Sequence, residues 1–136
     1  MILFLDANAL IYLIEGAEPF AGRVRRQLQA LVAEHPGARM AVSRLTVLEC
    51  RTGPMKTGDA AILSDYDAFF ARPDLAWVEL DATVIDLATA IRARHGLKTP
   101  DALQAACCLQ LGPGHLLVTG DKAFGRVAGL NVAVLR

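Results

Sequence analysis

Four acidic side chains stand where carboxylates could do chemistry. Asp6 follows the apolar stretch "ILFL", Asp121 follows the stretch "HLLVTG", and Glu49 and Asp101 fall in segments with helical patterns. Carboxylates gathered in one concavity repel one another and hold protons near neutral pH unless a cation compensates them. A divalent metal is the simplest such cation. Oxygen-only ligands favour Mg²⁺ or Mn²⁺, which can activate water and neutralise phosphate charge in phosphodiester hydrolysis.

The elements that must position these acids are short apolar strands alternating with longer amphipathic helices, a pattern typical of a parallel α/β sheet. Strands are expected at 2–5, 39–42, 76–80 and 115–119 and at the end of the chain. Ligands bind at the carboxyl ends of the strands in such sheets. Asp6 and Asp121 therefore become neighbours if their strands are adjacent.

Helices are expected over 8–15, 20–35, 44–51, 60–72, 82–95 and 100–111, with a short helix beginning near Asp121. Ser43 and Asp81 are placed as N-caps, and Thr99 is placed as the N-cap before Pro100. The stretch "TGPMKTGD" at 52–59 contains helix-breaking glycine and proline and is predicted to be a loop.

Composition restricts the class of protein. The 136 residues suit one domain, 54% are hydrophobic, and 14 Lys and Arg balance 14 Asp and Glu. Disorder and a generally cationic surface are excluded, so any nucleic-acid contact is local. No segment has the length of a membrane span or the pattern of a signal peptide, and three cysteines without metal-type spacing fit a reducing compartment. A cytoplasmic protein is expected.

Each acid also has a purely structural interpretation. Asp6 and Asp121 could be N-caps, Asp101 could stabilise a helix dipole, and Glu49 could be a solvated helix residue. The joint pattern of four is what favours a site.

The chain resembles the PIN-domain ribonucleases of the VapC toxin type over essentially its whole length. In "FLDANALIYL" Asp6 matches a metal ligand and Asn8 an orienting group, and "SRLTVLEC" supplies Ser43, Thr46 and Glu49. The phrase "KTPDALQAA" matches the third acid, Asp101. "LLVTGDKAF" supplies Thr119 and Asp121, although Gly120 stands where members of the family often carry Asn.

The resemblance implies one PIN-like domain over residues 1–136, a three-layer α/β/α sandwich around a mainly parallel sheet of about five strands. It implies an endoribonuclease whose acids Asp6, Glu49, Asp101 and Asp121 hold one or two Mg²⁺ or Mn²⁺ ions that generate the attacking hydroxide. The products would carry a 5′-phosphate and a 3′-hydroxyl. It further implies a toxin inhibited by a cognate antitoxin and usually assembled as a homodimer. Thr119 and Ser43 could bind water, a carboxylate or phosphate, or could simply form caps and turns.

Contacts with RNA should come from local basic side chains rather than from net charge. The candidates are Arg23, Arg25, Arg26, Arg44, Arg51, Arg92, Arg94, Lys122 and Arg126, any of which could equally belong to a solvated helix face. The three histidines do not cluster, and Phe69, Phe70 and Trp77 are expected in the core or an interface.

Two other classes of function stay open on the sequence. A phosphatase of the haloacid-dehalogenase type also begins with a strand and an acid, with Asp6 as nucleophile, but Asn8 stands where its general acid belongs and the chain is short. A non-catalytic RNA- or protein-binding domain could keep the fold without the chemistry.

Overall fold

Five parallel strands form the central sheet of the protein. The computed structural model describes all 136 residues. The strands are β1 (Ile2–Leu5), β2 (Arg39–Ser43), β3 (Ala76–Val78), β4 (His115–Thr119) and β5 (Val132–Val134). Their order is β3-β2-β1-β4-β5, and every neighbouring pair is parallel. The chain winds outward in both directions from β1, so the carboxyl ends of β1 and β4 form the crevice where ligands bind in such sheets.

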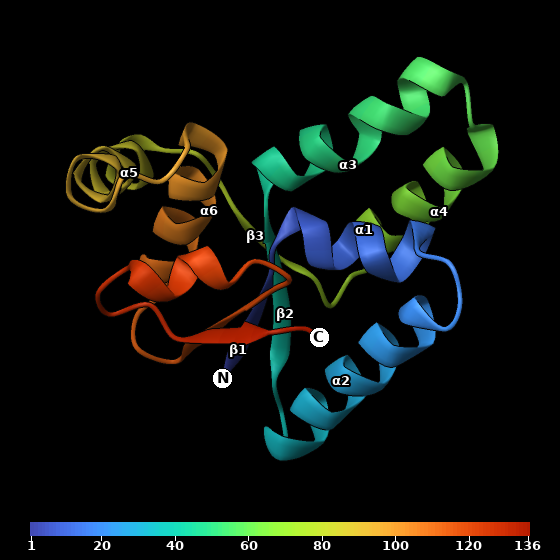
Figure 1. Cartoon of the computed structure of the whole chain (residues 1–136), viewed down its shortest axis with the longest axis horizontal. Helices are drawn as coiled ribbons and strands as arrows, with labels where there is room; N and C mark the ends of the chain where they lie inside the picture. The colour runs from blue at the N-terminus through green and yellow to red at the C-terminus, as the bar shows by residue number, and fades with distance from the viewer.

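Helices fill the connections between the strands. They are α1 (Ala7–Glu15), α2 (Phe20–Glu34), α3 (Arg44–Thr57), α4 (Ala60–Phe70), α5 (Ala82–His95), α6 (Thr99–Leu109) and the 3₁₀ helix η1 (Lys122–Arg126). Figure 1 shows α5 and α6 on one side of the sheet and α2 on the other. The expected three-layer α/β/α architecture is confirmed.

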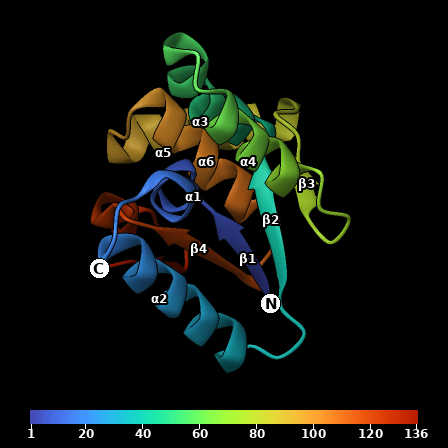
Figure 2. The ribbon, with the colours of Figure 1, turned by 90° about the vertical axis from the view of Figure 1, so that its right-hand side faces the viewer.

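Side chains that alternate along the strands supply both cores. Phe4 and Leu117 pack toward α5 and α6, whereas Leu3 and Leu5 pack toward α1 and α2. Both faces of β1 are therefore buried, which explains why "ILFL" is apolar throughout. A third cluster joins α1 to α3 and α4 beyond the strand ends. Figure 2 shows β1 and β2 running toward this end of the molecule.

The loop predicted at 52–59 is wrong, because α3 continues to Thr57. Pro54 lies inside the helix and is buried. The hydroxyls of Thr52 and Thr57 donate to the carbonyls of Leu48 and Gly53, one turn earlier. Packing and these local bonds outweigh the cost of a proline within a helix. The helix ends where Gly58 adopts φ 70°, a left-handed conformation that glycine takes without strain.

Other predicted boundaries also move: α4 ends at Phe70 rather than at residue 72, and α6 ends at Leu109 rather than at residue 111. Helix α6 begins at Thr99, with Lys98 at the N-cap position, and the Thr99 hydroxyl instead accepts a bond from Arg92. Strand β3 ends at Val78 rather than at residue 80. Val78 pairs with Ser43, the last residue of β2, so β3 has no partner beyond it. The caps predicted at Ser43 and Asp81 are confirmed. None of the helices combines the length and the apolar character needed to cross a membrane.

Candidate active site

Asp6 and Asp121 are joined through Thr119 at the ends of β1 and β4. The register pairs Leu5 with Val118, so the residues that follow each strand lie side by side. The Thr119 hydroxyl donates to Oδ2 of Asp6 over 2.8 Å and accepts from the backbone N–H of Asp121 over 3.0 Å. Adjacent parallel strands thus bring together two acids that are far apart in sequence, as the sequence predicted.

Asp6 and Asp121 are also N-caps. Asp6 accepts from the N–H of Ala7 over 2.9 Å, and Asp121 accepts from the N–H of Ala123 over 2.9 Å. The structural interpretation of both residues is therefore correct. It does not exclude the chemical one, because each carboxylate oxygen of Asp6 accepts one hydrogen bond and keeps a lone pair.

Asn8 ties the β4 loop to α1. Its Oδ1 accepts from the N–H of Gly120 over 2.9 Å. A Cβ at position 120 would lie 2.6 Å from Cε2 of Tyr12, one turn further along α1. The Tyr12 ring therefore occupies the space that a side chain at this position would take. This contact explains why the chain carries Gly120.

Glu49 comes from α3 and is held by a residue of α6. Nε2 of Gln104 donates to Oε1 of Glu49 over 2.8 Å and to the Thr46 hydroxyl over 2.9 Å. The Ser43 hydroxyl donates to Oε1 of Gln104 over 2.8 Å. Oγ of Ser43 also accepts from the backbone N–H of Thr46, and this bond caps α3. Ser43 thus has the capping role, and its other contact is an amide rather than a carboxylate.

Asp101 lies in the first turn of α6, behind Pro100 and one turn before Gln104. Its side chain is half-buried. Pro100 is tolerated there because the first helical residues have no intrahelical partner for their N–H groups. Helix α6 therefore presents Asp101 at its start and Gln104 from within its buried length.

Burial raises the pKa of three of the acids, and their mutual charges add to the effect. For Asp6, burial together with the charges of Glu49 and Asp101 raises the pKa to about 6, although the bonds from Thr119 and Ala7 act in the opposite direction. Burial, and then the charge of Asp121, raise the pKa of Asp101.

Burial likewise raises the pKa of Glu49, the Gln104 bond lowers it, and the charge of Asp101 raises it. The four carboxylates therefore form one electrostatically coupled group drawn from four elements of the fold.

No basic side chain neutralises this group. The ion pairs of the protein join Arg25 to Glu18, Arg44 to Glu79, Arg51 to Asp67 and Arg72 to Asp74, and none includes the four acids. The charge of Lys98 acts on Asp101, where it is the weakest of the contributions to the pKa. Arg44 also lies 4.0 Å from the centre of the Trp77 ring, at the same end of the sheet. The negative charge of the four carboxylates is therefore not balanced by a cation from the protein itself.

The donor set fits a hard divalent cation. All four side chains offer oxygen, the ligand type that Mg²⁺ and Mn²⁺ take. No group of three or more His, Cys, Asp or Glu side chains is arranged to hold an ion by itself. Mg²⁺ usually retains several waters and binds substrate phosphate oxygens as well, so it does not require a complete cage of protein ligands.

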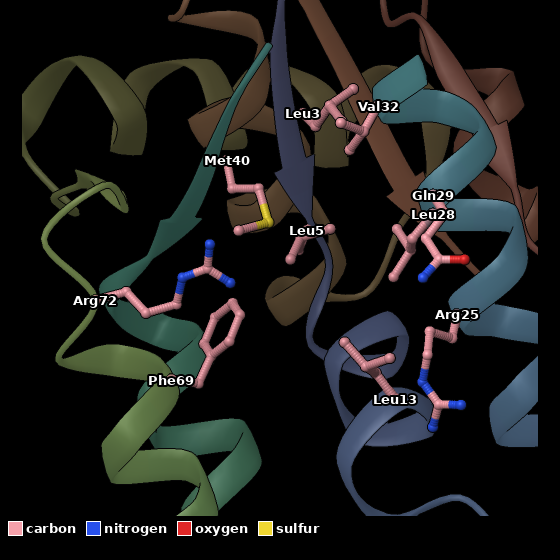
Figure 3. A pocket seen from close by; sticks show the side chains of 10 residues that line it. All are labelled: Leu3, Leu5, Leu13, Arg25, Leu28, Gln29, Val32, Met40, Phe69 and Arg72. Carbon is pink, nitrogen blue, oxygen red and sulfur yellow. The ribbon is translucent and has the colours of Figure 1, made fainter. Parts of the chain in front are cut away.

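A separate cavity of about 390 Å³ lies on the face of the sheet between α2 and α4 (Figure 3). Leu28 and Val32 of α2, Phe69 of α4 and Met40 of β2 contribute to its largely apolar lining, with Arg25 and Arg72 at its margin. None of the four acids lines it. The cavity is a candidate for contact with a partner rather than for chemistry.

Sequence reasoning located the four acids and Thr119 but missed Gln104. The signal was present: Gln104 is a lone polar residue in an apolar stretch of α6, three positions after Asp101. Phe69, Phe70 and Trp77 pack against the core cluster that contains Leu3 and Leu5, as expected.

Comparisons with known proteins concern the fold as a whole. The family model described as PIN domain matches residues 3–130. None of the curated protein sequences matches significantly. Among solved structures, VapBC2 from Rickettsia felis bound to a promoter DNA fragment matches with a TM-score of 0.80 at 20% identity, over 100% of both chains.

A toxin–antitoxin complex from Klebsiella pneumoniae matches with a TM-score of 0.72 at 22% identity, over 98% of both chains. VapBC-1 from nontypeable Haemophilus influenzae matches with a TM-score of 0.66 at 20% identity, over 99% of this chain and 98% of that one. At these identities the likeness establishes the fold.

Proposed function

This chain belongs to the PIN-domain family, and from that premise we propose that it is a metal-dependent endoribonuclease, the toxin of a VapBC-type toxin–antitoxin pair. The observation that supports the proposal is the group of interacting carboxylates formed by Asp6, Glu49, Asp101 and Asp121. No basic side chain of the protein forms an ion pair with any of them. The metal would be Mg²⁺ or Mn²⁺, and the products would carry a 5′-phosphate and a 3′-hydroxyl.

Asp6, Glu49, Asp101 and Asp121 are the residues that would hold the ion. When bound, it would activate water and offset the negative charge on the scissile phosphate. The protein's own contribution is preorganisation. Thr119 and the Ala7 N–H fix both oxygens of Asp6, so its carboxylate does not reorient when substrate arrives.

The burial that raises the pKa of Asp6 also excludes water around the reacting groups, which strengthens electrostatic interactions with phosphate. No histidine or lysine base is required. The phosphatase alternative needs an acid two positions after Asp6, whereas Asn8 accepts a hydrogen bond from the Gly120 N–H.

The test is cleavage of total cellular RNA by the purified protein, freed of any antitoxin, with Mg²⁺ or Mn²⁺. EDTA and the Asp6→Asn variant are the controls, and the 5′ ends of the products are mapped. Discrete cuts that require metal and Asp6 are expected. A folded, metal-supplied protein that leaves RNA intact would contradict the proposal, and a phosphoenzyme trapped at Asp6 would favour the phosphatase.

A cognate antitoxin is the proposed protein partner. The structural matches named above include toxin–antitoxin complexes, and the cavity between α2 and α4 offers an apolar surface, with Val32 49% exposed. The antitoxin should abolish RNA cleavage at equimolar ratio. Val32→Asp should weaken the complex without altering cleavage by the free protein, and unchanged affinity would exclude this surface.

A homodimer is the proposed assembly, and the proposed location is the cytoplasm. Leu48 and Met55 on α3 and Ile85 on α5 are large apolar side chains with exposed fractions of 63%, 59% and 47%. Sedimentation should give twice the mass of the chain, and Leu48→Glu should shift it toward monomer. Three buried free cysteines are compatible with a reducing compartment.

A further inference from the structure

The buried amide of Gln104 makes three hydrogen bonds, two of them to polar side chains of α3. The residue is 1% exposed. Its Oε1 accepts from Ser43, and its Nε2 donates to Thr46 and to Glu49. Because an ionised carboxylate only accepts, the nitrogen must face Glu49, and this fixes the orientation of the whole amide.

The amide satisfies the buried hydroxyls of Ser43 and Thr46, but only its bond to Glu49 reaches one of the four acids. The other buried residues of α6 are alanines and cysteines, so an apolar side chain would suit the same layer. Ser43 caps α3 through the Thr46 N–H without help from Gln104, and its hydroxyl lies 3.4 Å from that of Thr46. A buried amide is explained by the groups that it bonds to, and one of these three groups is an acid of the candidate site.

Glu49 is that group. Gln104 lies one turn after Asp101 on the same face of α6, so its bond to Glu49 ties an acid on α3 to the helix that carries another acid. The spacing between these two carboxylates then depends on one amide. No other side chain bonds to Glu49.

We propose that Gln104 is a positioning residue that holds the Glu49 carboxylate in place to receive the divalent cation. The inference rests on the proposed function, since it needs the four acids to be a metal site. It assigns a role to a residue outside the set that the sequence indicated. It also explains why an amide lies in the apolar layer beneath the acids.

The test compares Gln104→Met, which keeps the length of the side chain and removes its donors, with Gln104→Leu and with Cys108→Ala. Cys108 is buried in the same helix and contacts none of the four acids, so Cys108→Ala controls for loss of core packing. Circular dichroism and thermal unfolding establish that each variant folds. Mn²⁺ affinity is measured by calorimetry without RNA, and kcat and KM are measured separately on a short RNA.

Gln104→Met and Gln104→Leu should weaken Mn²⁺ binding by about 10–100-fold and lower kcat by a similar factor, the range seen when partners of metal ligands are removed. KM for RNA should stay within about threefold. Cys108→Ala should keep the affinity and kcat of the wild type. Adding Gln104→Met to Glu49→Gln should cost little beyond Glu49→Gln alone, because both remove the same interaction.

Wild-type Mn²⁺ affinity and kcat in Gln104→Met would overturn the inference and leave the proposed function standing. So would equal losses in Gln104→Met and Cys108→Ala, or fully additive losses in the double variant. A wild-type protein that neither binds Mn²⁺ nor cleaves RNA would overturn the proposed function and, with it, this inference.

Discussion

The two strand-borne acids and the two helix-borne acids are positioned in different ways. Asp6 and Asp121 follow paired strands and are fixed by backbone N–H groups and by Thr119. Glu49 and Asp101 extend from α3 and α6, and Glu49 depends on Gln104. The pairing of β1 with β4 positions the first pair, and the Thr119 hydroxyl bonds to both residues. The position of the second pair depends on how two helices pack. The strand-borne half is held by the sheet and by backbone hydrogen bonds, and the helix-borne half is held by helix packing and one side-chain amide.

The largest expected effect is on RNA cleavage by Asp6→Asn. We expect a loss on the order of 1,000-fold or more, above the range for removing a mere partner of a ligand, because a metal ligand itself is neutralised. Asp101→Asn should also abolish detectable cleavage while leaving the fold intact. Cleavage rates on a defined RNA measure both. Full activity in either variant would remove that acid from the site.

The next effect is on the free energy of unfolding, which the ionised Asp6 carboxylate lowers even though the proposed activity requires that carboxylate. The folded pKa of Asp6 is raised from 3.8 to about 6, so the folded state binds more protons than the unfolded state between these pH values. Stability of the metal-free protein therefore falls as pH rises through this window, by about 3 kcal/mol for this group over the whole window and by about 2 kcal/mol between pH 4.5 and 7.5. Denaturant unfolding in EDTA at pH 4.5 and 7.5 measures the second of these changes.

Asp6→Asn is the matched control for that measurement. The variant cannot ionise at position 6, so it should lack this part of the pH dependence and be more stable than the wild type at pH 7.5. Mn²⁺ should restore the stability of the wild type and not that of the variant. Parallel pH curves for the two proteins would show that Asp6 ionises freely in the folded state.

A smaller effect is expected from Thr119→Val, which breaks the link between the strand-borne acids. The Asp121 N–H and Oδ2 of Asp6 both lose their partner, so we expect a stability loss of about 1–3 kcal/mol and a 10–100-fold slower cleavage. Thr119→Ser keeps the hydroxyl and should stay near the wild type. A Val variant as active as the Ser variant would show that the register alone is sufficient.

The smallest effect is expected from Gly120→Ala. Its Cβ would lie 2.6 Å from the Tyr12 ring, so the ring or the loop must shift, at a cost of about 1 kcal/mol in unfolding free energy. Tyr12→Ala in the same chain should relieve the clash, and a double-mutant cycle measures the coupling. Additive losses would mean that the ring does not constrain the loop.

The sequence predicted most of the fold and the closeness of Asp6 and Asp121, and it failed where distant packing decides. Asp6 and Asp121 were predictable because parallel strands align their ends. Gln104 was not, because its partners lie at the end of β2 and on α3, 55 to 61 positions away, and nothing local indicates that they meet. Pro54 predicts a helix break from the sequence because its burial within α3 is likewise invisible along the chain.

The hydrogen bond from Thr119 to Asp6 also sets the stage of translation at which the candidate site can first form. It joins residues 113 positions apart, so β4 must emerge and pair with β1 before the first acid meets its partner. Contacts of such long sequence separation form late because of the loop entropy they must overcome. A ribosome-bound chain that ends before β4 therefore has Asp6, Glu49 and Asp101 but no assembled centre. Under the proposed function, a nascent chain of this design cannot cleave RNA until β4 has been made and has paired with β1.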